Sequence, residues 1–185
     1  MELLIKKAQK GDEEAFIQAI NEYLPPMYKI AKIRLHSEDD IGDAIQDTIL
    51  AAYRDLHKLR QPRFFKTWIT RILINKCNDI VQSRGKVVYV EDYSQLGEGS
   101  LSFTHPDLEG EIDFSRTLTM LSESHRTVII LHYVNGFTSR EIGEILNEKE
   151  NTIKSQLNRA RQKLKEFYLN GNGQVQPNTS GGLTQ

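Results

Sequence analysis

The sequence predicts an all-α protein made of two small helical domains joined by a flexible acidic linker. Apolar residues recur at helical spacing over most of residues 1–86, which indicates a first helical domain. Residues 87–112 carry six acidic and no basic side chains among glycines and a proline, as a linker does. Helical spacing returns over residues 113–169 and predicts the second domain. Residues 170–185 contain few hydrophobic side chains and predict a disordered tail.

The first domain is expected to contain four helices whose ends are marked by caps and prolines. Asp12 follows a glycine and is expected to cap the second helix. Pro25 and Pro26 predict a break or kink in that helix, because neither can donate to the preceding turn. The acids at 38–40 predict the start of a third helix, since the helix dipole favours negative charge there. A long amphipathic fourth helix is expected over residues 64–83.

Residues 137–165, at the end of the second domain, have the pattern of a helix-turn-helix. Thr138 followed by Glu141 fits a capping box that opens one helix. Asn147 falls where the turn needs a residue that tolerates left-handed backbone. Residues 152–165 then carry five Lys or Arg and no acid. Such charge can serve solubility alone, but a polar and basic face on the second helix is also what contact with the DNA major groove requires.

Charge is distributed unevenly along the chain. The whole chain has a net charge of −1, yet residues 1–53 carry −4, residues 54–86 carry +7, residues 87–112 carry −6 and residues 113–169 carry +2. Two basic segments are therefore separated by an acidic one. This asymmetry is compatible with nucleic-acid binding, against which the nearly neutral total would otherwise argue.

The sequence predicts no catalytic residues, no metal site and no cofactor. The five histidines form no HExxH pair, and no P-loop, GxGxxG or GxSxG motif is present. The acids within residues 38–47 could be imagined as a nuclease metal cluster, but three are consecutive and point around a helix. The single cysteine, Cys77, is interpreted as a buried structural thiol. We expect neither a signal peptide nor an apolar run of the ~20 residues that span a membrane, and hence a cytoplasmic protein with no membrane insertion of its own.

Three segments together resemble bacterial RNA polymerase sigma factors of the extracytoplasmic-function type. Residues 39–53, DDIGDAIQDTILAAY, resemble the signature of region 2 in that family. Residues 62–81, PRFFKTWITRILINKCNDIV, resemble the helix that follows it. Residues 121–164 resemble region 4, with Thr-Ile-Lys-Ser near the start of the recognition helix. Three such motifs in this order around an acidic linker are more specific than any one of them.

The resemblance implies a role for each part of the chain. Residues 1–86 would form region 2, which binds core polymerase and the −10 promoter element, and residues 113–169 would form region 4, which reads the −35 element. In the family, an acidic helix of region 2 docks on the polymerase, and Asp43, Gln46 and Asp47 match its surface. The candidates for −10 contacts, where Phe64 could equally be a core residue, are Arg60, Arg63, Phe64, Lys66, Arg71 and Asn75. The candidates for −35 contacts are Asn151, Thr152, Lys154, Ser155, Asn158 and Arg159.

The resemblance thus implies a sigma factor that confers promoter choice on core RNA polymerase and is controlled by an anti-sigma factor. Two alternatives remain from the residues alone. A stand-alone helix-turn-helix regulator would bind promoter DNA without polymerase, and a DNA-processing enzyme would use the acids within 38–47. The chain departs from the family where Asn147 replaces the usual glycine. It also places two acids, Glu148 and Glu150, where they repel phosphate.

Replacing Arg159 with alanine is expected to weaken promoter binding by roughly 1–3 kcal/mol if Arg159 makes a bidentate base contact, and by less if it touches phosphate. Fluorescence anisotropy with a promoter duplex at fixed salt measures the change. Unchanged affinity and unchanged base preference would remove Arg159 from the reading surface.

Overall fold

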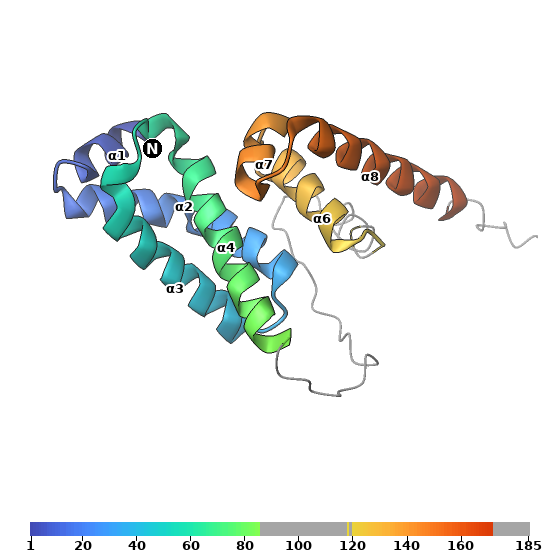
Figure 1. Cartoon of the computed structure of the whole chain (residues 1–185), viewed down its shortest axis with the longest axis horizontal. Coiled ribbons are helices and arrows are strands. Elements are labelled where there is room, and N and C mark those ends of the chain that lie inside the picture. The colour runs from blue at the N-terminus through green and yellow to red at the C-terminus, as the bar shows by residue number, and fades with distance from the viewer. Residues whose placement is uncertain (86–117, 119, 172–185) are drawn as a thin grey trace, which may run out of the picture.

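The computed structural model describes residues 1–85, 118 and 120–171 (Figure 1). Every regular element in these residues is a helix, so the predicted all-α fold is confirmed. The helices form two groups, one from each half of the chain, as Figure 1 shows. The predicted linker at 87–112 lies outside the described residues, and the last helix extends to Gly171.

Over the first 85 residues, the second, third and fourth helices build one bundle, and the first helix packs against the second. Gln9 joins the turn after the first helix to the connection between the third and fourth. Its side-chain amide donates to the carbonyls of Leu56 and Leu59 at 3.0 and 2.7 Å. The elements are α1 (Glu2–Ala8), α2 (Glu13–Arg34), α3 (Glu38–Asp55), two 3-10 turns (Leu56–Lys58 and Pro62–Phe64) and α4 (Phe65–Gly85).

The core of this bundle depends on one side of α4. Phe65, Ile69 and Leu73 are each fully buried and follow the four-residue spacing of a helix face. The hydroxyl of Tyr23 in α2 shares a hydrogen bond of 2.9 Å with that of Thr70, so both buried polar groups have a partner. Burial raises the pKa of Tyr23 to about 12. These contacts fix the rotation of α4 about its own axis, and therefore which side chains its other faces present.

Helix α2 is continuous where the sequence predicts a break. It passes through Pro25 and Pro26 although neither has an N–H group to donate. Tyr23 on one side of the prolines is 4% exposed and Met27 on the other is 0% exposed. Burial on both sides offsets a local cost of about 3 kcal/mol for an interior proline. Of the predicted break or kink, the break is therefore wrong, because α2 continues through both prolines.

The C-terminal group of helices contains the predicted helix-turn-helix. The hydroxyl of Thr138 accepts from the Glu141 N–H at 3.2 Å, and the Glu141 carboxylate accepts from the Thr138 N–H at 2.9 Å, which confirms the capping box. Asn147 has a φ of 56° and so takes the predicted left-handed conformation. The elements are α6 (Glu123–Ile129), a π-helical turn (Ile130–Val134), α7 (Ser139–Leu146) and α8 (Glu150–Gly171).

A close backbone approach sets the geometry of the turn between α7 and α8. A β-carbon added at Gly143 would lie 2.7 Å from the carbonyl oxygen of Glu148. The N–H of Glu148 donates to the Gly143 carbonyl at 2.9 Å, so the two residues are held together. The absence of a side chain at position 143 therefore lets the start of α8 fold back onto α7.

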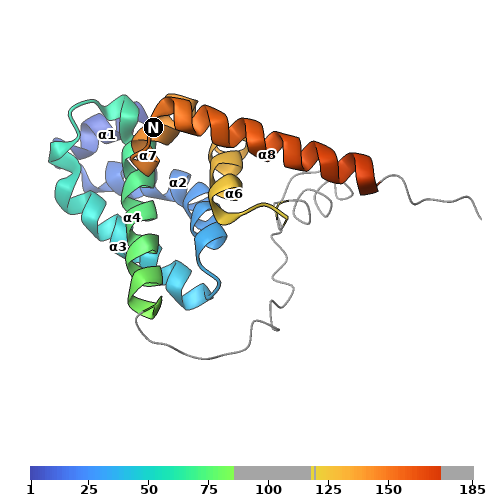
Figure 2. The same cartoon turned by 45° about the vertical axis from the view of Figure 1, so that its right-hand side comes forward.

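The two groups of helices pack against each other in a compact arrangement. Helix α7 lies against α4, and α6 lies against α2, which both views show (Figures 1 and 2). An ion pair of 3.3 Å joins Arg34 of α2 to Glu123 of α6. The hydroxyl of Thr67 in α4 donates to the carboxylate of Glu141 in α7 at 3.4 Å. One face of α4 therefore lies beneath the helix-turn-helix.

Replacing Gly143 with alanine is expected to destabilise the C-terminal group by roughly 1–3 kcal/mol, because the new β-carbon would meet backbone rather than a flexible side chain. Urea unfolding followed by circular dichroism measures the loss. Gly42 of α3 is the matched control, since nothing lies within 4 Å of its added β-carbon. Alanine there is expected to stabilise the protein by roughly 0.5–1 kcal/mol. A Gly143→Ala protein as stable as its parent would contradict the close approach.

Candidate nucleic-acid interface

Helix α8 presents its predicted contact face to solvent. Its apolar side is buried, with Ile153, Leu157 and Ala160 each at most 1% exposed. The predicted residues lie within the opposite half of the helix surface, as their spacing requires. The face of α8 chosen from the sequence is therefore the exposed one. All six are exposed: Asn151, Thr152, Lys154, Ser155, Asn158 and Arg159.

Local interactions already engage part of this face. Lys154 forms an ion pair of 2.7 Å with Glu150 one turn earlier. The hydrogen bond and charge of Lys154 lower the pKa of the Glu150 carboxyl below its usual value. The hydroxyl of Ser155 donates to the Asn151 carbonyl at 2.9 Å. Arg159 lies near His125 of α6, whose pKa is lowered by burial and by the charges of Lys163 and Arg159.

The residues predicted to bind polymerase form one exposed stripe on α3. Asp43, Gln46 and Asp47 point away from the buried side of the helix. Asp47 pairs with Lys76 of α4 at 3.2 Å. The sequence analysis did not single out Leu50, which continues the stripe one turn later and is 61% exposed. Its spacing of three and four residues from Asp47 and Gln46 could have identified it, and we call these four residues the α3 stripe.

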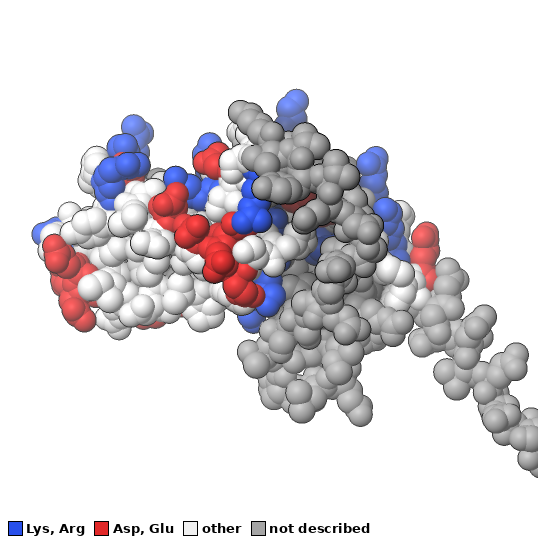
Figure 3. Space-filling model, turned by 90° about the horizontal axis from the view of Figure 1, so that it is seen from below, with Lys and Arg blue, Asp and Glu red and all other residues white. Residues whose placement is uncertain are grey.

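Charges of both signs meet on the surface beside this stripe. Besides the pair between Asp47 and Lys76, Arg84 near the end of α4 pairs with Asp40 of α3 at 2.6 Å. Seen from below, acidic side chains gather in a band with basic side chains next to them (Figure 3). The sequence separates the acidic and basic segments, but the fold places parts of them side by side.

The residues predicted for −10 contacts divide into two groups. The first group lies around the connection into α4, where Arg60, Arg63, Phe64 and Lys66 are all exposed. The guanidinium of Arg63 lies 4.7 Å from the centre of the Phe64 ring. Phe64 is 39% exposed, so the structure places it on the surface rather than in the core. This group combines an accessible aromatic ring with three cations.

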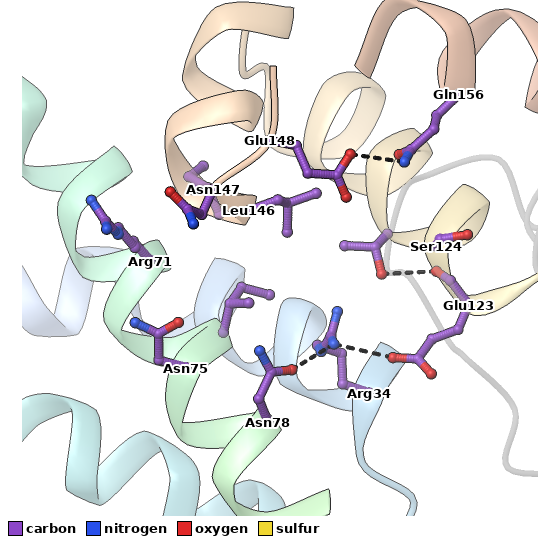
Figure 4. A pocket seen from close by; sticks show the side chains of 13 residues that line it. Arg34, Arg71, Asn75, Asn78, Glu123, Ser124, Leu146, Asn147, Glu148 and Gln156 are labelled. Carbon is purple, nitrogen blue, oxygen red and sulfur yellow. Dashed lines mark hydrogen bonds and ion pairs between the residues drawn. The ribbon is translucent and has the colours of Figure 1, made fainter. Parts of the chain in front are cut away.

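The second group, Arg71 and Asn75, lies farther along α4 and lines a cavity of about 440 Å³ between the two groups of helices (Figure 4). Asn147 and Glu148, in the turn of the helix-turn-helix, line the opposite side. Below them, Arg34 donates to Asn78 at 2.6 Å and pairs with Glu123. Arg71 and Asn75 are exposed as well, but they lie beside this cavity and not at the connection into α4 that carries Phe64.

The described part of the chain contains neither a metal-binding cluster nor a membrane-spanning helix. No group of three or more His, Cys, Asp or Glu side chains there could hold a metal ion, which leaves the nuclease hypothesis without a cluster in those residues. Nor does any helix in the same residues have the length and apolar character to cross a membrane. Cys77 is buried, as predicted, and burial raises the pKa of its thiol to about 11.

Known proteins resemble the chain over nearly its whole length. Residues 19–87 match the family model for Sigma-70 region 2, and residues 112–164 match that for Sigma-70, region 4. The chain is 28% identical over 182 residues to ECF RNA polymerase sigma factor SigW of Bacillus subtilis, covering 90% of this chain and 97% of that protein. It is 27% identical over 176 residues to the ECF RNA polymerase sigma-E factor of Escherichia coli, covering 87% and 90%.

Solved structures agree with this assignment. The sigma factor RpoE from Bartonella quintana, in a co-crystal structure with the anti-sigma factor NepR, matches with a TM-score of 0.65 and 28% identity, covering 83% of this chain and 96% of that one. The family expected from the sequence is thus confirmed by two family models, matched in the expected order. The chain belongs to the sigma-70 family of bacterial RNA polymerase sigma factors, of the extracytoplasmic-function type.

Proposed function

We propose that the protein binds core RNA polymerase in the cytoplasm, directs it to specific promoters and is controlled by an anti-sigma factor. It would supply promoter choice and no catalytic residue of its own. The observation that carries the proposal is the presence of both family regions in order, each with an exposed surface of the required chemistry. The α3 stripe would meet polymerase, the surface around Phe64 would meet the −10 element, and α8 would meet the −35 element.

Region 4 would read the −35 element by placing the N-terminal half of α8 in the major groove. Asn158 and Arg159 have the side-chain types that form hydrogen bonds with base edges. Thr152, Ser155 and Lys154 would contact phosphate and set the register, which carries little base preference. The capping box of α7 and the left-handed Asn147 fix the angle at which α8 leaves the turn. The reading helix is therefore held rigidly before DNA arrives.

Region 2 would engage the −10 element around Phe64. Extruding a base from a duplex costs a few kcal/mol. Stacking of a base on an aromatic side chain returns about 1–3 kcal/mol. Phe64 is accessible for such stacking, and Arg63 beside its ring could pair with the strand backbone. Arg60 and Lys66 add positive charge on the same part of the surface.

Polymerase binding would use the α3 stripe. Its polar members can pair with basic side chains of a partner, and Leu50 supplies an apolar contact that excludes water. Since Asp47 already pairs with Lys76, docking would exchange one exposed ion pair for another. A stand-alone helix-turn-helix regulator would have no evident use for this stripe. Control by an anti-sigma factor is supported by the similar RpoE, which was solved in complex with one.

Run-off transcription tests the proposal. Purified core polymerase with this protein is expected to start transcripts at defined promoters, found by mapping 5′ ends after overexpression. A stand-alone regulator would instead bind the same DNA tightly in the absence of polymerase and would not start transcripts. Absence of any promoter-dependent start above core polymerase alone would overturn the proposed function.

Replacing Leu50 with alanine is expected to weaken the binding of core polymerase by about 1–2 kcal/mol, as for other central apolar contacts. Its 61% exposure means that stability should not change. Asp47→Ala should act in the same direction, and biolayer interferometry with immobilised polymerase measures both. The matched control is Leu3→Ala in α1, because Leu3 is 74% exposed and lies outside the stripe. Equal affinities for Leu50→Ala and Leu3→Ala would exclude Leu50 from the interface.

A further inference from the structure

The cavity of about 440 Å³ lies where the two groups of helices meet (Figure 4). Its walls come from α2, α4, α6, α7, α8 and the turn between α7 and α8, so neither group forms it alone. The volume falls within the range of small-molecule sites, roughly 300–1,000 Å³. No residue of the α3 stripe lines it, and none of the six candidate residues of α8 does. The polymerase and −35 surfaces therefore leave this cavity without an assigned role.

One edge of the cavity is rich in hydrogen-bond donors. Arg71 and Asn75 of α4 lie there together with Asn147 of the turn (Figure 4). All three are exposed, and within the described residues no hydrogen bond or ion pair engages their side chains. A guanidinium and two amides present positive charge and several N–H groups to an anion, which phosphate oxygens can accept. We call these three residues the anion edge.

Carboxylates line the cavity away from the anion edge (Figure 4). Glu123 is engaged by Arg34, at 3.3 Å. One oxygen of Glu148 accepts from the side-chain amide of Gln156 at 2.9 Å. Its second oxygen accepts no hydrogen bond from any residue that the structure describes. Since a carboxylate only accepts, this oxygen favours a ligand group that carries N–H.

Apolar side chains line the rest of the cavity. Leu146 is half-buried and lies between the anion edge and Glu148 in the close view (Figure 4). Ile74 and Ile145, each 2% exposed, also line the cavity. The lining therefore suits a ligand that is anionic at one end, apolar across its middle and an N–H donor at the other end.

We infer that this cavity binds a free purine nucleotide, with the phosphate at the anion edge and the N–H groups of the base at Glu148. In a nucleotide the phosphate and the base edge lie at opposite ends, and the flat faces of the base can rest on Leu146. An amino acid carries both charges on one carbon and would serve only one end. Guanine offers a carboxylate two adjacent N–H donors where adenine offers one, so guanine nucleotides should bind more tightly.

The inference goes beyond the proposed function and does not depend on it. Arg71 and Asn75 are also candidates for −10 contact, and a nucleotide within a DNA strand has the same chemistry as a free one. The two sources differ in one respect, because a strand would need no contribution from Glu148 and the turn. A free ligand would touch α4 and the turn at once and so stabilise the folded chain.

Isothermal titration calorimetry of the full chain tests the site without DNA or polymerase. The probes are GMP, guanosine, AMP and a short single-stranded DNA oligonucleotide of mixed sequence. One GMP per chain is expected to bind, with guanosine roughly tenfold weaker because it lacks the charged hydrogen-bonding group. AMP should bind several-fold more weakly than GMP. The midpoint of thermal unfolding should rise with GMP concentration, since the ligand binds the folded state.

Two substitutions assign the ends of the ligand. Arg71→Ala is expected to weaken GMP roughly tenfold and to leave guosine-type binding without phosphate, measured with guanosine itself, unchanged. Glu148→Gln should remove the preference for GMP over AMP while its side chain can still pair with Gln156. Arg140→Ala and Glu144→Gln are the matched controls, because they make the same charge changes on α7 outside the cavity. Circular dichroism establishes that each variant is folded.

Three results would overturn the inference. GMP that neither binds nor raises the unfolding midpoint excludes the site. Equal loss of GMP affinity in Arg71→Ala and Arg140→Ala would show that only net charge matters. Binding of the oligonucleotide that GMP does not displace, in a protein with no affinity for GMP alone, would assign Arg71 and Asn75 to a DNA strand. A protein that binds GMP but starts no promoter-dependent transcript would contradict the proposed function and leave the nucleotide site standing.

Discussion

The structure depends on helix α4 packing against both groups of helices at once. One side places Phe65, Ile69 and Leu73 in the core of the N-terminal bundle, where each is fully buried. Because these side chains are large and closely packed, they fix the rotation of α4 about its own axis. Thr67 and Asn78 are then directed at the C-terminal helices, and Phe64 is left on the surface at the start of the helix. The same packing that stabilises region 2 therefore decides where on the surface its candidate DNA contacts, all of them exposed, are placed.

The geometry of the helix-turn-helix, unlike the orientation of α4, depends mainly on interactions between residues that are close together in the sequence. Its first helix begins at a capping box, and its turn combines the left-handed Asn147 with the close approach of Gly143 to Glu148. Asparagine accepts this conformation at a modest cost compared with the glycine that is usual there. Because these interactions lie within about ten residues of one another along the chain, they position α8 without help from region 2.

Confirmed predictions share a physical basis. The capping box at Thr138, the turn at Asn147, the Asp12 cap and the buried Cys77 each follow from interactions within a few residues or from helical spacing. Of the break or kink predicted at Pro25 and Pro26, the break does not occur, because the missing hydrogen bonds are a local cost while the compensating burial of Tyr23 and Met27 is not local. Leu50 was overlooked for a related reason, since an exposed leucine in an amphipathic helix resembles a core residue until its neighbours in space are known.

The amino-acid sequence was sufficient for the fold class, the order of the two regions and the exposed face of α8, because periodicity and capping act at short range. Through the resemblance to the family, it also named Arg71 and Asn75 as candidates for DNA contact. The contacts of Thr67 with Glu141 and of Arg34 with Glu123, which bring the C-terminal helices against α4 and α2, join residues separated by 74 and 89 positions in the chain. No short-range pattern records a pairing over such a distance. That pairing places Arg71 and Asn75 beside the cavity under the helix-turn-helix, apart from the group around Phe64.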